Sequence, residues 1–213
     1  MNIKKIKIIL VDDHAIVRAG FRLLLSNIDD IEVIAEAERG EQLMQLYADT
    51  QPDIVILDLS MPGIGGLETI RRIINRYNDA KILVFSVHNE WVYINRAIDA
   101  GASGYICKSS APQCLLNAIY KIAAGEIYLE QVTEKQSIHS DMHYREVINH
   151  LSAREFDVFL LLAKGLNTHS IASELCLSYK TVANYSTQIK AKLAVATIAE
   201  LVRIAMVLDI IKN

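Results

Sequence analysis

The sequence predicts an α/β domain with a five-stranded parallel sheet, followed by a small all-helical domain. Three observations lead to this prediction. Short runs rich in Ile and Val alternate with stretches of helical period up to residue 124, a polar segment covers 125–149, and only helical period follows in 150–213. With 213 residues, 52% of them apolar, the chain has an ordinary globular composition and enough length for two cores.

The predicted strands are short apolar runs, as expected for strands that are buried on both faces of a parallel sheet. They are Ile6–Val11, Ile31–Ala35, Asp53–Leu57, Ile82–Ser86 and Gly104–Cys107. Stretches of helical spacing lie between and after them, at Ala15–Asn27, Glu41–Ala48, Leu67–Tyr77, Trp91–Ala100 and Pro112–Ala124. In such alternating sheets ligands bind at the carboxyl ends of the strands, so functional residues are expected just after each strand.

Residues 125–149 are mostly polar, and we interpret them as a partly helical linker between domains 1–124 and 150–213. Four helical stretches follow, at Ala153–Lys164, His169–Leu175, Tyr179–Leu193 and Ile198–Ile211. The second and third are joined by a short turn that ends in Ser178, a residue type favoured at helix N-caps. Two short helices joined in this way predict a helix-turn-helix unit.

Composition and charge exclude several classes of protein. The longest apolar run, Val158–Ala163, is far shorter than the ~20 residues of a membrane-spanning helix. The run Ile8–Val11 stops at two aspartates, which argues against a signal peptide, and three scattered cysteines favour reduced thiols in the cytoplasm. The net charge is -3, yet residues 150–213 carry seven basic and five acidic side chains, a weak sign of a nucleic-acid partner.

Polar side chains follow the predicted strands at the ligand-binding edge: Asp12 and Asp13 after the first, Asp58 after the third, Ser86 at the end of the fourth and Lys108 after the fifth. Clustered carboxylates favour a hard divalent cation, and so few protein ligands suit water-rich Mg²⁺ better than Ca²⁺. With an ammonium and a hydroxyl, such a cation would neutralise a phosphoryl group passing to Asp58. Taken singly, each residue is better explained by a structural role, Asp13 as a helix cap and Asp58 as a loop residue. The convergence of all five favours the functional interpretation.

The first domain resembles the receiver domains of two-component response regulators. The matching stretches are Val11-Asp12-Asp13-His14, residues 58–66, Ser86 and residues 101–108. This resemblance covers about residues 5–124 and implies a flavodoxin-like strand order, 2-1-3-4-5. It also implies that Asp58 accepts a phosphoryl group from a partner sensor histidine kinase.

The same resemblance implies a role for each neighbouring residue. The ligands of Mg²⁺ would be Asp12, Asp13, Asp58 and the backbone carbonyl of Ser60. Three further residues would respond to the phosphoryl group, Lys108 and Ser86 by binding its oxygens and Tyr105 by following Ser86 inward.

Phosphorylation would change the charge of this edge. An aspartyl phosphate carries about -1.5 to -2 charges, where the carboxylate carried -1, and it adds acceptor oxygens. We therefore expect the face around Trp91–Ala100 and Tyr105 to repack and to offer a dimerisation surface.

Residues 150–213 resemble the LuxR-type DNA-binding domain. The pattern includes Leu151-Ser152-x-Arg154-Glu155, Lys164-Gly165-Leu166-Asn167 and Ser178-x-Lys180-Thr181-Val182. A receiver followed by this domain is similar to the NarL/FixJ class of response regulators. Within that class, residues 60–68 and 109–113 are most like the GacA/UvrY-type global regulators.

The resemblance implies that Tyr179–Leu193 enters the major groove of double-stranded DNA. The predicted DNA-binding residues are Ser178, Lys180, Thr181, Asn184, Tyr185, Thr187, Gln188 and Lys192. An Asn side chain suits adenine and a Thr methyl suits thymine, although a solvated helix face explains Asn184 and Thr187 equally well. His169 and Ala183 stand where the family often has lysine, so we expect weak binding by a monomer and a need for dimers.

We therefore expect a cytoplasmic transcription regulator that dimerises when phosphorylated, and not an enzyme. A phosphatase that uses Asp58 as a transient nucleophile would share the carboxylate chemistry, but it needs no groove-reading helix. A receiver-controlled module that binds protein without binding DNA stays open, because the helical domain is only weakly basic. The salt dependence of duplex binding separates the DNA and protein alternatives.

Overall fold

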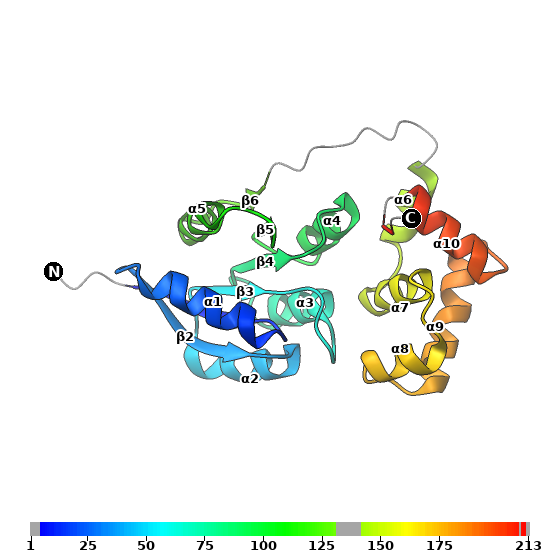
Figure 1. Ribbon diagram of the computed structural model, residues 1–213, viewed down its shortest axis with the longest axis horizontal. Coiled ribbons are helices and arrows are strands. Elements are labelled where there is room, and N and C mark those ends of the chain that lie inside the picture. Colours follow the sequence, from blue (N-terminus) through cyan, green and yellow to red (C-terminus); the bar gives the residue numbers. More distant parts are fainter. Residues whose placement is uncertain (1–4, 131–141, 209, 212–213) are drawn as a thin grey trace. The chain divides into compact units, whose positions relative to one another are not determined.

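The computed structural model describes residues 5–130, 142–208 and 210–211. The chain divides into two compact units, one built around a parallel sheet and one built from helices. Figure 1 shows both units and the labels of their elements. Residues 131–141, within the predicted linker, lie outside the described residues.

The sheet has the strand order β2-β1-β3-β4-β5-β6, and all neighbouring strands are parallel. The strands are β1 (Ile6–Val11), β2 (Ile31–Ala37), β3 (Ile54–Leu57), β4 (Ile82–Ser86), β5 (Gly104–Cys107) and β6 (Tyr128–Leu129). The first five confirm the predicted order and the all-parallel arrangement.

The sixth strand corrects the expected count of five. β6 pairs with β5, matching Gly104 with Tyr128 and Tyr105 with Leu129, inside the segment predicted to be a linker. A two-residue strand is too short to show an alternation of apolar and polar residues in the sequence. It forms because the exposed edge of β5 offers it hydrogen-bonding partners. Gly125, with a positive φ of 89°, follows the last helix of the unit and reverses the chain toward that edge.

Helices cover the sheet because each presents an apolar stripe to it. Their bounds are α1 (Ala15–Ser26), α2 (Gly40–Thr50), α3 (Gly66–Arg76), α4 (Trp91–Asp99) and α5 (Pro112–Ala123). Side chains of α1 and α5, among them Leu25 and Ile119, pack in one core with strand residues such as Ile8 and Ile54. The alternate strand residues, Val55 for example, are also fully buried, so both faces of the sheet are covered.

The second unit contains α6 (Met142–Asn149), α7 (Ala153–Ala163), α8 (Thr168–Glu174), α9 (Tyr179–Lys192) and α10 (Ile198–Val207). Side-chain caps begin α7 at Ser152, α8 at Asn167, α9 at Ser178 and α10 at Thr197. Buried residues such as Phe156, Phe159, Val182 and Leu201 form its core. Local capping therefore fixes where these short helices begin, and apolar packing holds them together.

The predicted last helix, Ile198–Ile211, is too long. α10 ends at Val207, and the backbone N–H of Ile210 donates to the carbonyl of Ala205 instead of continuing the helix. Leu208 and Ile210 are still buried, so the apolar residues beyond Val207 reflect burial and not helix. Among the described residues, none of the helices combines the length and apolar character needed to span a bilayer.

Candidate functional site

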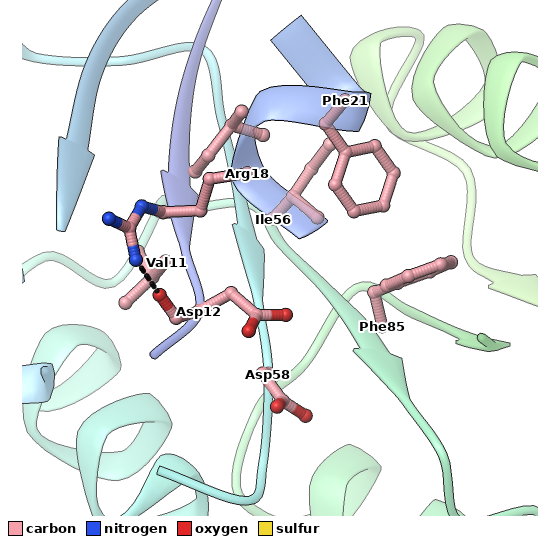
Figure 2. A pocket seen from close by; sticks show the side chains of 8 residues that line it. Val11, Asp12, Arg18, Phe21, Ile56, Asp58 and Phe85 are labelled. Carbon is pink, nitrogen blue, oxygen red and sulfur yellow. Dashed lines mark hydrogen bonds between the residues drawn. The ribbon is translucent and has the colours of Figure 1, made fainter. Parts of the chain in front are cut away.

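The ends of β1, β3, β4 and β5 bring the predicted residues to one edge of the sheet. Parallel pairing aligns Val11 with Leu57, and Ser86 with Cys107. The residues that follow these positions therefore emerge side by side. Figure 2 shows the carboxylates of Asp12 and Asp58 next to each other at the ends of their strands.

One lysine joins the two buried carboxylates. Lys108 Nζ lies 2.6 Å from Asp12 Oδ2 and 2.9 Å from Asp58 Oδ2. Asp58 is only 2% exposed and Asp12 only 4%. Burial of a charge is costly unless it is paired, so this ammonium is what allows two carboxylates to share a buried edge.

The pKa values of these groups follow from burial and pairing. Burial raises the pKa of Asp58 above its ordinary value, and the hydrogen bond and charge of Lys108 offset only part of that rise. Burial alone would lower the pKa of Lys108, but its bonds to Asp12 and Asp58 outweigh burial and raise that pKa. The pair is therefore a carboxylate destabilised by burial and an ammonium stabilised by its partners.

The acidic residues are compatible with a divalent cation. One ligand atom each from Asp12, Asp13, His14 and Asp58 lies within 4.8 Å of the others. Among the residues that the structure describes, Asp13 Oδ1 is buried and has no hydrogen-bond partner, although His14 Nδ1 is 2.9 Å away. Clustered carboxylate oxygens of this kind are suitable ligands for a hard cation.

Ser60 lies in the loop after β3, where its backbone N–H donates to Asp58 Oδ1 over 3.3 Å. This bond fixes the orientation of the Asp58 carboxylate. The contact involves the amide of Ser60, and the predicted role of its carbonyl as a metal ligand stays a prediction.

Ser86 and Tyr105 both contact one residue that the sequence did not indicate, His88. The Ser86 hydroxyl is fully buried and accepts a bond of 3.3 Å from the backbone N–H of His88. The Tyr105 hydroxyl donates to the backbone carbonyl of His88 over 2.7 Å, and its ring is buried. His88 Nε2 also lies 3.2 Å from Ser60 Oγ, and its ring stacks on Tyr93. His88 therefore links the loop after β4 to Ser60, Ser86 and Tyr105.

Arg18 of α1 is a second residue that sequence reasoning missed. Its guanidinium is buried and donates from Nη1 to the backbone carbonyl of Asp12 over 2.6 Å, the dashed bond in Figure 2. Glu36, near the end of β2, accepts from Nε, and Glu38, just after β2, accepts from Nη2. The sequence signal for these contacts was the presence of an arginine in a predicted helix whose other face is apolar.

In the helical unit, the residues predicted to bind DNA lie on or beside α9. Thr181 and Tyr185 are half-buried, and the other predicted residues are exposed: Ser178, Lys180, Asn184, Thr187, Gln188 and Lys192. Ser178 Oγ accepts from the backbone N–H of Thr181 as the helix cap. The hydroxyl of Thr187 donates to the carbonyl of Ala183. Its hydroxyl is therefore used within the helix.

Lys192, at the end of α9, forms an ion pair within its own unit. Its Nζ donates to Glu155 Oε2 over 2.6 Å, and Glu155 is buried at the start of α7. Glu155 also accepts from the backbone N–H of Ser152. The charge of Lys192 thus stabilises α7 and anchors the end of α9.

Comparison with known proteins matches both units to families. Residues 8–120 match "Response regulator receiver domain", and residues 149–205 match "Bacterial regulatory proteins, luxR family". The transcriptional activator protein ExaE of Pseudomonas putida is 40% identical over 204 residues, which cover 93% of this chain and 95% of that protein. The chain belongs to the response regulators of the NarL/FixJ class.

Other relatives of this response regulator agree. UvrY of Escherichia coli K12 is 36% identical and GacA of Pseudomonas aeruginosa PAO1 is 34% identical; the matches cover 94% of this chain and 94% and 95% of those proteins. RcsB of Salmonella enterica serovar Typhimurium, solved on the rprA promoter with the phosphomimetic BeF₃⁻, has a TM-score of 0.65 and 27% identity. That match covers 94% of this chain and 98% of RcsB. The response regulator therefore shares its two-part organisation with transcription regulators over nearly its whole length.

Proposed function

We propose that a sensor histidine kinase phosphorylates Asp58 and that this modification controls dimerisation and sequence-specific DNA binding in the cytoplasm. In this proposal residues 1–124 form the phosphoacceptor domain, 125–149 the linker and 150–213 the DNA-binding domain. The observation that supports it best is the lysine bridge, since Lys108 lies within 3 Å of both Asp12 and the buried Asp58. The capped helix α9 supplies an exposed reading surface in the same chain.

The phosphoryl transfer would form a bond from a carboxylate oxygen of Asp58 to phosphorus. The bond from phosphorus to the imidazole nitrogen of the kinase breaks, and that nitrogen keeps the electron pair. Lys108 already contacts Asp58 Oδ2 and is placed to pair with the incoming phosphoryl oxygens. Asp12, Asp13, Asp58 and the Ser60 carbonyl would hold Mg²⁺, which when bound supplies positive charge opposite the phosphoryl oxygens.

Ser86 and Tyr105 would carry the signal away from Asp58. Before modification the Ser86 hydroxyl accepts from the His88 amide, and Tyr105 donates to the His88 carbonyl. A phosphoryl oxygen is a strong, charged acceptor, so the Ser86 hydroxyl is expected to turn toward it and donate to it, and this movement would take Ser86 Oγ away from the His88 amide. Movement of the His88 loop then changes the surface at α4, where we place the activated dimer contact.

DNA binding would use the exposed side of α9 with its predicted residues, Asn184 and Thr187 reading bases and Lys180 contacting phosphate. Because Lys192 is paired with Glu155, few cations of one copy are available for phosphates. Two copies on adjacent half-sites would raise the affinity by coupling two weak contacts, about 10²–10⁴-fold. Solved structures of RcsB, which is 27% identical to this chain, on the rprA promoter and as two dimers bound to DNA support this arrangement.

Two measurements on the full chain test the proposal. Radiolabelled acetyl phosphate with Mg²⁺ should label the natural chain and fail to label Asp58→Ala; equal labelling of both would refute the choice of acceptor. A label that disappears with continuous turnover of acyl phosphate, without any gain in dimer or DNA affinity, would favour a phosphatase.

Binding of the labelled chain to duplex DNA should weaken steeply with salt, with a slope of about -0.9 per neutralised phosphate. A flat slope would eliminate DNA and leave the protein-binding alternative.

A further inference from the structure

The additional strand β6 is followed directly by Glu130, whose carboxylate contacts the turn that carries Lys108. The backbone N–H of Glu130 donates to the carbonyl of Tyr105 over 3.2 Å, in line with the pairing of β6 and β5. One step further along, the N–H of Cys107 donates over 3.1 Å to Glu130 Oε2, a side-chain oxygen. Glu130 thereby extends the ladder of bonds beyond the last paired residues of the strands.

The same oxygen of Glu130 also accepts a hydrogen bond from the hydroxyl of Ser110. Cys107 and Ser110 are the two ends of a tight turn, closed by the bond from Ser110 N–H to the carbonyl of Cys107 over 3.0 Å. Lys108 is the second residue of that turn. A single half-buried carboxylate therefore holds both ends of the turn from outside the sheet.

The opposite side of the turn is bonded to the sheet. The N–H of Lys108 donates to the carbonyl of Ser86 over 2.7 Å, so β4 holds the turn on the inner side while Glu130 holds it on the outer side. A lysine side chain is long and flexible, and its ammonium reaches a target reproducibly only when its backbone origin is fixed. The bonds of Lys108 to Asp12 and Asp58 span only 2.6 and 2.9 Å and depend on that origin.

We propose that Glu130 is a positioning residue for Lys108, so that the first residues of the predicted linker belong to the phosphorylation site. This inference rests on the proposed function of Asp58. A displacement of β6 would then change the position of the Lys108 ammonium relative to Asp12 and Asp58. The predicted linker and the phosphorylation site are therefore mechanically connected through the Glu130 carboxylate.

The first test measures labelling of the full chain by acetyl phosphate. Glu130→Ala should slow labelling roughly fivefold, the effect of about one net hydrogen bond, while Glu130→Gln, whose amide oxygen still accepts, should restore most of the rate. Glu126→Ala is the matched control, because Glu126 is an exposed acid of the same segment.

A second measurement is hydrogen exchange of the Cys107 amide. In the natural chain this amide should be protected from exchange, and Glu130→Ala should expose it without any phosphoryl donor.

A double-variant cycle tests whether Glu130 acts through Lys108. If it does, Glu130→Ala adds no further loss to Lys108→Ala, whereas an independent structural effect would multiply the two losses. Multiplicative losses, or an unchanged rate in Glu130→Ala, would overturn the inference even though the natural chain is labelled. Failure to label the natural chain, with the Cys107 amide still exposed in Glu130→Ala, would instead refute the function proposed for Asp58.

Discussion

The acidic edge of the sheet and the exposed side of α9 differ in how their polar groups are held and in how exposed these groups are to water. At the edge, groups from distant strands meet, and Asp58 is almost fully buried and paired with Lys108. Along α9, the predicted DNA-binding groups lie on or beside one helix and most of them are exposed, while a cap and buried residues hold that helix in place. A phosphorylation site needs a buried charge that is paired, whereas DNA recognition needs solvated groups on a rigid support.

The largest effect predicted for the acidic edge is the loss of phosphoryl labelling when Lys108 is removed. Lys108→Ala leaves Asp12 and Asp58 as unpaired buried carboxylates, and it removes the ammonium that faces the phosphoryl oxygens. Labelling by acetyl phosphate should fall about a hundredfold, as for loss of one donor to a developing anion. Lys164→Ala, which removes an exposed lysine of the helical unit, should leave labelling unchanged. A Lys108→Ala chain that labels at the natural rate would contradict the assigned role.

On α9, two exposed residues should separate base reading from phosphate binding. Asn184→Ala should cost about 1–3 kcal/mol on the preferred duplex and little on unrelated duplexes. Lys180→Ala should weaken both duplexes and reduce the salt slope by about 0.9. Titration of each variant against both duplexes at several salt concentrations checks this. Equal losses for Asn184→Ala on both duplexes would refute base reading.

The support of α9 depends on Glu155. Glu155→Ala removes the reciprocal cap of α7 and the partner of Lys192, and it should destabilise α7 by about 1 kcal/mol. Amide hydrogen exchange of α7 in the full chain measures this loss locally. Glu174→Ala, which removes an exposed acid of α8, should have no effect on α7. Unchanged exchange in Glu155→Ala would show that the cap is dispensable.

The same carboxylate should give the helical unit a pH dependence. Burial raises the pKa of Glu155, but hydrogen bonds from Lys192 and Ser152 outweigh burial and leave that pKa below its ordinary value of 4.5. Its stabilising contribution is therefore complete above pH 4.5 and is lost as the pH falls through the lower, folded-state pKa. Exchange of α7 amides should accelerate over that acidic range in the natural chain and respond less in Glu155→Gln.

The sequence predicted the acidic edge because each of its groups follows a strand. Parallel strands place their carboxyl ends together, so the sequence alone groups Asp12, Asp58 and Lys108. The cap of α9 was predictable for a similar reason, since Ser178 directly precedes a helical period.

His88, Arg18 and Glu130 could not be found in this way. Each is joined by a hydrogen bond to a residue of another element or loop: the backbone carbonyl of His88 accepts from the Tyr105 hydroxyl, Arg18 donates to the carbonyl of Asp12, and the Glu130 carboxylate accepts from the N–H of Cys107. Such contacts depend on loop conformation and on which strand occupies the sheet edge, and neither leaves a periodic pattern. β6 escaped prediction for the same reason, because its partner edge and not its own sequence makes it a strand.

The ion pair between Lys192 and Glu155 also affects how fast the chain associates with DNA. Caps at Ser178 and Asn167 fix the starts of α9 and α8, and the ion pair fixes the other end of α9. A reading helix that is already ordered loses little conformational entropy when it meets its target. Encounter with DNA should therefore proceed as docking of a rigid body, with an association rate governed by electrostatic steering and not by coupled folding.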